Sequence, residues 1–197
     1  MISIPGIQVG PHGAAVPAGQ AAQSGQSPPT QVDVFVDYMC PYCRRFEQDN
    51  AAALQQLVDR DVTALVMHPI AILDRLSAGS LYSTRAAAAA YAVAAGAPAR
   101  FGAFNAALFA DQPREGSAGL SEAELRQVAA ASGIEQAVGL TLAGDQFTAA
   151  AQAGTQAALE AGLQGTPTVL LSSRHHGAHL WDGSRPVAEW LLSLAAR

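Results

Sequence analysis

The chain is 197 residues long, half of them hydrophobic, and carries a formal net charge of −5. This length and composition suffice for one compact domain with a core of its own. Every basic residue is an arginine, and none of them cluster into the basic stripe that nucleic acids and anionic membranes require, so we expect neither as a partner. No apolar run reaches the roughly 18 residues that would cross a bilayer.

The first third of the chain predicts a strand–helix–strand unit. Ser3–Val9 is short, apolar and broken by a proline, which predicts an edge strand at best, and residues 11–30 have the Gly-, Pro- and Ser-rich composition of a flexible loop. Gln31–Val36 places its valines at alternate positions, which predicts a strand. Apolar residues then recur at helical spacing to about Arg60, and Val62–Met67 predicts a second strand.

A long segment without strand character follows, from about Ser77 to Leu163. Ser80–Ala95 is rich in alanine and predicts a helix. Ser121 and Glu124 have the spacing of a capping box, which predicts that another helix begins there. The side chains expected to form the core of this helical block are Phe101, Phe104, Leu108 and Phe109.

Strand character returns at Thr168–Ser172 and Ala178–Trp181, and Pro186–Ala196 predicts a final helix that begins with proline. We therefore predict an α/β fold in which both ends of the chain share one sheet and a helical domain is inserted between them. The expected divisions are residues 1–76, 77–163 and 164–197.

The two cysteines of the chain stand three positions apart, where the first strand turns into the first helix. A disulfide between them would close too small a loop to stabilise the fold much. The unpaired N–H groups and dipole of a helix start favour a thiolate at Cys40, and Cys43 lies close enough to resolve a mixed disulfide. Pro41 and Tyr42 lie between the two and tune their reactivity. This arrangement predicts thiol–disulfide chemistry.

A zinc site is the alternative for such a pair, but it needs four ligands, and the chain has no second Cys pair. His175, His176 and His179 could in principle complete a set of two cysteines and two histidines. The proline inside the motif and the strand-to-helix setting favour redox chemistry. We therefore expect no metal and no cofactor.

A second feature lies more than 120 residues downstream, where Gly165-Thr166-Pro167-Thr168 leads into a strand. One interpretation is an ordinary turn with a trans proline. The other is a cis-proline loop that lies beside the cysteines. Because cis bonds before proline are uncommon, the position of the proline alone does not decide between them.

Taken together, these segments resemble one family. Phe35–Glu47, the helical block and the Gly165–Thr168 turn, in this order, resemble the corresponding parts of DsbA-like proteins of the thioredoxin superfamily, over roughly Val32–Arg197. The resemblance implies a thioredoxin-like fold with an inserted helical domain. It also implies disulfide donation to exported proteins, with protein thiols or disulfides as substrates and a membrane partner that reoxidises the enzyme.

The resemblance also implies roles for single residues. Cys40 would be the exposed nucleophile and Cys43 its buried partner, while a cis Pro167 and the backbone of Thr166 would hold an extended substrate segment. Many relatives carry a buried carboxylate six residues before the first cysteine, where this chain has Val34.

Water or another acid must then serve any proton relay. Asp33 is expected to face the opposite side of the strand, whereas Asp37 lies at the strand end and Glu47 stands one helical turn after the second cysteine. Asp37 and Glu47 are therefore the candidates. His68 is expected to be structural, and Trp181 is expected to pack in the core or at the sheet edge.

The N-terminus lacks the features of a signal peptide. We expect an extracytoplasmic protein if an export segment precedes Met1 in nature, and a cytoplasmic one if Met1 is the native start. Two other functions stay open: a cytosolic thioredoxin-like reductase or redox-stress protein, and a metal- or peptide-binding module with an inert Cys pair.

Overall fold

The computed structural model describes residues 4–16, 30–139, 142, 144–173 and 177–195. Across these residues the centre is a five-stranded sheet of order β1-β3-β2-β4-β5. Its strands are β1 (Ile7–Val9), β2 (Thr30–Val36), β3 (Thr63–Pro69), β4 (Thr168–Ser173) and β5 (Gly177–Leu180). β2 and β3 are parallel, and the other neighbouring pairs are antiparallel. The predicted α/β class, with one sheet shared by both ends of the chain, is confirmed.

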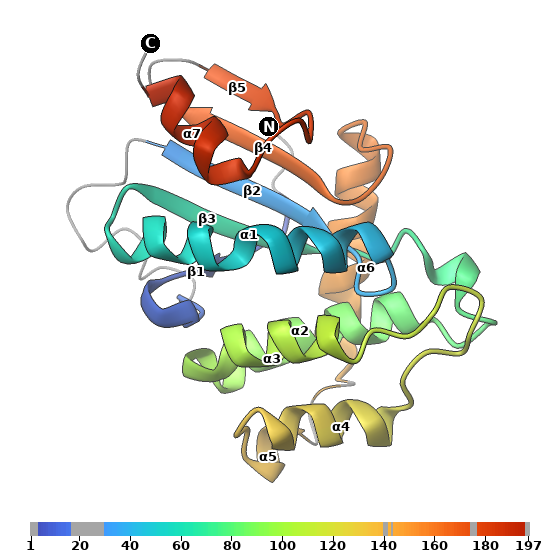
Figure 1. Ribbon diagram of the computed structural model, residues 1–197. Helices are drawn as coiled ribbons and strands as arrows, with labels where there is room; N and C mark the ends of the chain where they lie inside the picture. The colour runs from blue at the N-terminus through green and yellow to red at the C-terminus, as the bar shows by residue number, and fades with distance from the viewer. Residues whose placement is uncertain (1–3, 17–29, 140–141, 143, 174–176, 196–197) are drawn as a thin grey trace.

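Helices cover both faces of this sheet (Figure 1). α1 (Pro41–Asp59) and α7 (Val187–Ala195) lie on one face, and α6 (Asp145–Glu160) lies on the other. The remaining helices fall, as predicted, in the segment between β3 and β4: α2 (Tyr82–Gly96), α3 (Phe101–Ala110), α4 (Glu122–Ala131) and the short α5 (Gln136–Gly139). In the described part of the chain, no helix is long and apolar enough to cross a membrane.

The alternation read in β2 decides which side chains reach which face. Val32, Val34 and Val36 are buried in the main core, on the face that α1 covers. Phe35 points the other way and packs against Ala158 of α6. Because successive strand residues point to opposite faces, β2 is anchored from both sides, and each buried valine stabilises the fold by about 1.5–3 kcal/mol.

The inserted helices join the same core. The four side chains expected to form their centre are all buried, and they belong to the cluster that contains the β2 valines. The ring of Phe109 lies 4.9 Å from that of Tyr38, in the turn just before the cysteines. The predicted capping box opens α4, where Ser121 Oγ accepts from the Glu124 N–H and the Glu124 carboxylate accepts from the Ser121 N–H.

The ends of the chain depart from the prediction in detail. β1 is an edge strand as expected, but it begins only at Ile7, after Pro5 and Gly6. Within the predicted loop of residues 11–30, a 3₁₀ turn covers Pro11–Gly13, and residues 17–29 lie outside the described part. A hydrogen bond fixes this turn to α1, because the His12 N–H donates to the Asp59 carboxylate at 2.8 Å.

Candidate active site

The Cys pair lies where β2 gives way to α1. Cys40 is the N-cap residue of α1, with extended backbone angles, and Pro41 occupies the first helical turn, where its missing N–H costs nothing. The Cys40 N–H donates to the carbonyl of Asp37 at 3.0 Å, which closes the turn between strand and helix. Both cysteines are free thiols. The strand-to-helix setting inferred from the sequence is therefore observed.

Cys40 faces the loop that precedes β4. Its thiol donates to the carbonyl of Thr166 at 3.2 Å, across 126 positions of sequence. The pKa of Cys40 falls from 9.0 to about 6, chiefly because the Cys43 side chain hydrogen-bonds to it; burial opposes this, and the Thr166 side chain and the N–H groups of Cys43 and Tyr42 lower the pKa further. Cys40 therefore forms a thiolate below neutral pH, as a helix start favours.

The two thiols differ sharply in their surroundings. Cys43 is fully buried, and its Sγ accepts from the Asp37 N–H at 3.5 Å. Burial raises the pKa of Cys43 well above its ordinary value. Cys40 is itself only 4 % exposed, so the expectation of an exposed nucleophile is wrong, because the Thr166 backbone lies over its sulfur. Tyr42, between them, is 71 % exposed.

A groove runs from this point along α1. It has a volume of about 860 Å³, and its walls include Tyr42, Phe46, Thr166, Pro167 and Trp181. The peptide bond between Thr166 and Pro167 is cis. The β2–β4 pairing, in which Phe35 opposes Thr168, brings this loop to the end of the sheet where the cysteines lie.

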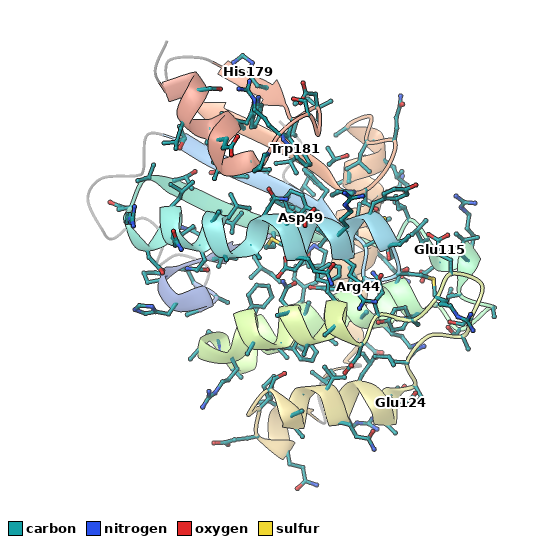
Figure 2. All side chains as sticks on the ribbon, in the orientation of Figure 1. Arg44, Asp49, Glu115, Glu124, His179 and Trp181 are labelled. Atoms are coloured by element: carbon teal, nitrogen blue, oxygen red, sulfur yellow. The ribbon has the colours of Figure 1, made fainter. Side chains whose placement is uncertain are left out.

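Trp181 is a groove residue that the sequence reasoning missed. It follows β5, and its ring meets the ring of Phe46 edge-on at 5.4 Å between centroids. Its Nε1 donates to the carbonyl of Arg185 at 2.8 Å, which holds the indole in place. Asp49, labelled with Trp181 in Figure 2, lines the same groove from α1 and pairs with Arg45 at 3.5 Å. Trp181 therefore offers the groove a rigid aromatic wall.

Asp37 lies beside Cys43 and is fully buried. Its carboxylate accepts from the Met39 N–H and the Ser83 hydroxyl through one oxygen, at 2.9 and 2.7 Å, and from the Leu73 N–H through the other, at 2.9 Å. Burial raises the pKa of Asp37 from 3.8 to about 6, against the lowering effect of these bonds. The structure thus places this candidate next to the buried thiol.

Glu47 lies one turn along α1 and faces the inserted helices. Its Oε1 accepts from Nδ2 of Asn105 at 2.9 Å, and Oδ1 of Asn105 accepts from the Tyr38 hydroxyl at 2.8 Å. Burial raises the pKa of Glu47 from 4.5 to about 7. The carboxyl borders a cavity of about 290 Å³ between α1, α3 and the sheet. Both acids considered for the proton relay, Asp37 and Glu47, are therefore buried carboxyl groups with raised pKa values.

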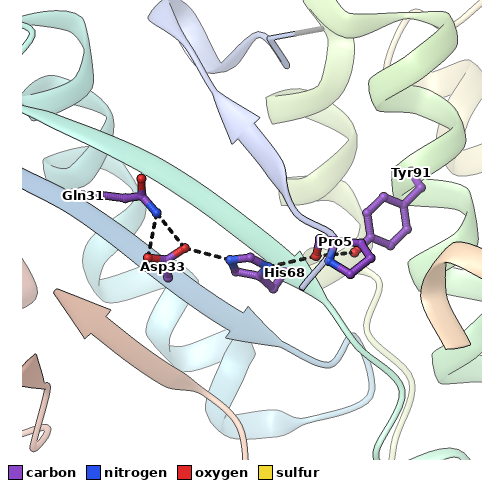
Figure 3. A network of polar contacts seen from close by, with 5 residues as sticks. All are labelled: Pro5, Gln31, Asp33, His68 and Tyr91. Carbon is purple, nitrogen blue, oxygen red and sulfur yellow. Dashed lines mark hydrogen bonds and ion pairs between the residues drawn. The ribbon is translucent and has the colours of Figure 1, made fainter. Parts of the chain in front are cut away.

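Asp33 faces away from the cysteines, as the strand alternation predicts. It belongs to a network on the far side of the sheet (Figure 3), where its Oδ1 lies 2.9 Å from Nε2 of His68. The other ring nitrogen of His68 lies 2.9 Å from the carbonyl of Pro5, and Phe35 stacks on the ring at 4.4 Å. His68 therefore ties the N-terminal segment to the sheet, which is the structural role expected of it.

No group of three or more His, Cys, Asp or Glu that could hold a metal ion occurs among the residues that the structure describes. His175 and His176 lie outside those residues. Val34, where the resemblance noted from the sequence leads one to expect an acid, is fully buried and packs in the main core.

A family model described as thioredoxin matches residues 24–185 of the chain. The chain belongs to the thioredoxin family. Among solved structures, this thioredoxin-family chain is similar to oxidised DsbA of Mycobacterium tuberculosis, with 26% identity and a TM-score of 0.71 over 97% of this chain and 100% of that one. It is also similar to reduced DsbG of M. tuberculosis, with 25% identity and a TM-score of 0.71 over 98% and 94% of the two chains.

BdbD of Bacillus subtilis, at 18% identity and a TM-score of 0.73 over 98% and 94% of the chains, shares the fold. The predicted DsbA-like resemblance of this thioredoxin-family protein is therefore confirmed. A curated relative, the serine/threonine-protein kinase PknE of M. tuberculosis, is 34% identical over 178 residues. The match covers 84% of this chain, which spans only 30% of the kinase.

Proposed function

We propose that this chain is a DsbA-like thiol–disulfide oxidoreductase that donates its Cys40–Cys43 disulfide to exported proteins. The observation that carries the proposal is the contrast between the two thiols. Cys40 has a pKa of about 6, and Cys43 lies fully buried behind it with a raised pKa. Such a pair stabilises the reduced form through the Cys40 thiolate, and a stable reduced form makes the disulfide a strong oxidant.

The reaction balances in two exchanges. A substrate thiolate attacks the sulfur of Cys40, the bond between the two enzyme sulfurs breaks, and Cys43 leaves and takes up a proton. A second substrate thiolate then attacks the substrate sulfur of the mixed disulfide, and Cys40 leaves as a thiolate. The substrate loses two electrons to the cysteines. The low pKa of Cys40 favours the second exchange, because a more acidic thiol leaves faster.

Cys43 needs a proton when it leaves, and we propose that Asp37 and Glu47 handle it. Their pKa values of about 6 and about 7 suit proton transfer near neutrality. Asp37 donates its backbone N–H to Cys43, but both of its carboxylate oxygens already accept hydrogen bonds. The Glu47 carboxyl borders a cavity that water can enter, which supports its exchange of protons with solvent.

The groove beside the cysteines supports a protein substrate. Thr166 and Pro167 line the groove, and the Thr166 carbonyl also accepts from the Cys40 thiol, so an extended segment in the groove could pair with the backbone of Thr166 as an added strand. Trp181 and Phe46 provide an apolar wall for one of its side chains. We propose that a membrane partner returns the reduced cysteines to the disulfide.

Single-cysteine variants and a reduction potential test this function. Cys40→Ser is expected to abolish disulfide donation to a reduced peptide. Cys43→Ser is expected to accumulate a mixed disulfide with that peptide through Cys40, seen as a mass increase that dithiothreitol reverses. Full activity of Cys40→Ser would refute the assignment.

The reduction potential of the Cys pair distinguishes a disulfide donor from a reductase. A disulfide donor has a value of about −120 mV, as DsbA has, and a reductant has about −270 mV, as thioredoxin has. A value close to that of thioredoxin would favour the reductase alternative. Stoichiometric metal binding with unreactive thiols would favour the binding module.

A further inference from the structure

Gln112, just after α3, reaches the turn in front of the Cys pair from the inserted helices. Its Nε2 donates to the carbonyl of Tyr38 at 3.0 Å and to the carbonyl of Cys40 at 2.9 Å. A side-chain amide has two N–H donors, so these two bonds use both. The two carbonyls flank Met39, whose own N–H donates to the Asp37 carboxylate at 2.9 Å. The turn is therefore fastened from the sheet side by Asp37 and from the helical side by Gln112.

The same turn controls the sulfur of Cys40. The Cys40 carbonyl also accepts from the N–H groups of Cys43 and Arg44, at 3.0 and 3.2 Å, and these are the first hydrogen bonds of α1. The N–H groups of Tyr42 and Cys43 in that first turn help to stabilise the Cys40 thiolate. A change in the tilt of the first turn would move these donors relative to the sulfur.

We propose that Gln112 is a positioning residue, which orients the first turn of α1 so that its N–H groups point at the Cys40 sulfur. The inference rests on the proposed function. Gln112 is not among the residues that line the groove; its amide acts through the carbonyls of Tyr38 and Cys40. Without it the thiolate loses stabilisation, and Cys40 becomes a poorer leaving group in disulfide donation.

Gln112→Met tests this, because methionine has nearly the same length, carries no charge and lacks both donors. The matched control is Gln156→Met on α6, where the side-chain amide donates only to Glu160, at 2.8 Å. The measurement is the rate of Cys40 alkylation by iodoacetamide at pH 6 and at pH 9, with the Tm of each variant. Even after a tenfold rise in its proton affinity, Cys40 is almost fully ionised at pH 9, so that rate reports access rather than thiolate stability.

We expect Gln112→Met to alkylate roughly fivefold more slowly at pH 6, as a tenfold rise in proton affinity of Cys40 would produce, with less than about a twofold change at pH 9. The control should match the wild type at both values. A lower Tm with an unchanged ratio of the two rates would show that Gln112 only braces the turn, and would overturn the inference while leaving the proposed function intact. An ordinary, slow rate for the wild type at pH 6 would overturn both.

Discussion

Replacing Asp37 with asparagine tests whether burial raises the pKa of the Asp37 carboxyl group. The side chain is fully buried and meets three donors, the N–H groups of Met39 and Leu73 and the hydroxyl of Ser83. Burial outweighs these bonds and raises the pKa of Asp37 from 3.8 to about 6. An asparagine at this position would keep the shape of the side chain but would not titrate.

The sign of the effect follows from proton counting. Between about pH 4 and about pH 6 the folded protein holds a proton on Asp37 that the unfolded chain has lost, so stability from this group falls as pH rises through that window. At about 1.4 kcal/mol for each tenfold change in proton affinity, the rise in pKa corresponds to about 3 kcal/mol. Part of this is already lost at pH 4, so the wild type should lose about 2.4 kcal/mol relative to Asp37→Asn between pH 4 and pH 7.

A second, constant effect is superimposed. The asparagine amide turns an N–H toward one of the three donors, and an unpaired buried donor costs about 1–3 kcal/mol at every pH. Asp37→Asn should thus be less stable than the wild type at pH 4 and should equal or exceed it at pH 7. Urea unfolding at four pH values between 4 and 7 measures both effects. An offset that stays constant over this range would refute the argument that burial raises this pKa.

Ser83→Ala serves as the companion variant. It removes one hydrogen bond that lowers the pKa of Asp37, while leaving the carboxyl group in place. The upper end of the pH window should therefore move to higher pH instead of disappearing. A window that stays where it is would mean that the hydroxyl contributes nothing to the ionised state.

Two further predictions concern turnover. Glu47→Gln should slow disulfide donation at pH 7 by about tenfold. It should also remove the inflection near pH 7 from a stopped-flow pH–rate profile, because the group with a pKa of about 7 is then absent. An unchanged profile would exclude Glu47 from proton transfer. Trp181→Ala should raise the KM for a peptide substrate severalfold, because it removes one wall of the groove. The rate of Cys40 alkylation should stay the same, because the groups that set the pKa of Cys40 do not include Trp181. An altered alkylation rate would show that the tryptophan acts on the sulfur.

The sequence predicted the structure correctly where a feature depends on residues close together in the chain. The alternation in β2, the helical spacing of α1 and the capping box at Ser121 each depend on residues a few positions apart, and the structure contains all three. The strand-to-helix position of the Cys pair was predictable for the same reason, because a strand ends just before Cys40 and Pro41 marks the start of the helix. The groove role of Trp181 was missed for the opposite reason: its ring reaches the groove only because β5 pairs with β4 beside α1, which no neighbouring residue encodes.

The polar partners of the active site were hidden from the sequence for the same reason, and they share an origin. Ser83 holds Asp37, Asn105 holds Glu47, and Gln112 holds the carbonyl of Cys40, and each comes from the helical segment between β3 and β4. None belongs to a motif, because each acts across 46 to 72 positions of sequence.

The inserted helices therefore do more than enlarge the core. They supply one hydrogen-bonding side chain to each group to which we assign a part in the proposed redox chemistry: the two carboxyl groups with raised pKa values and the first turn of the helix that bears Cys40. A shift of α2 or α3 relative to α1 would weaken these bonds together. The proton affinities of Asp37, Glu47 and Cys40 are thus coupled to the packing of the inserted helices through these hydrogen bonds. The same cysteines on a thioredoxin sheet without the inserted helices would have different pKa values.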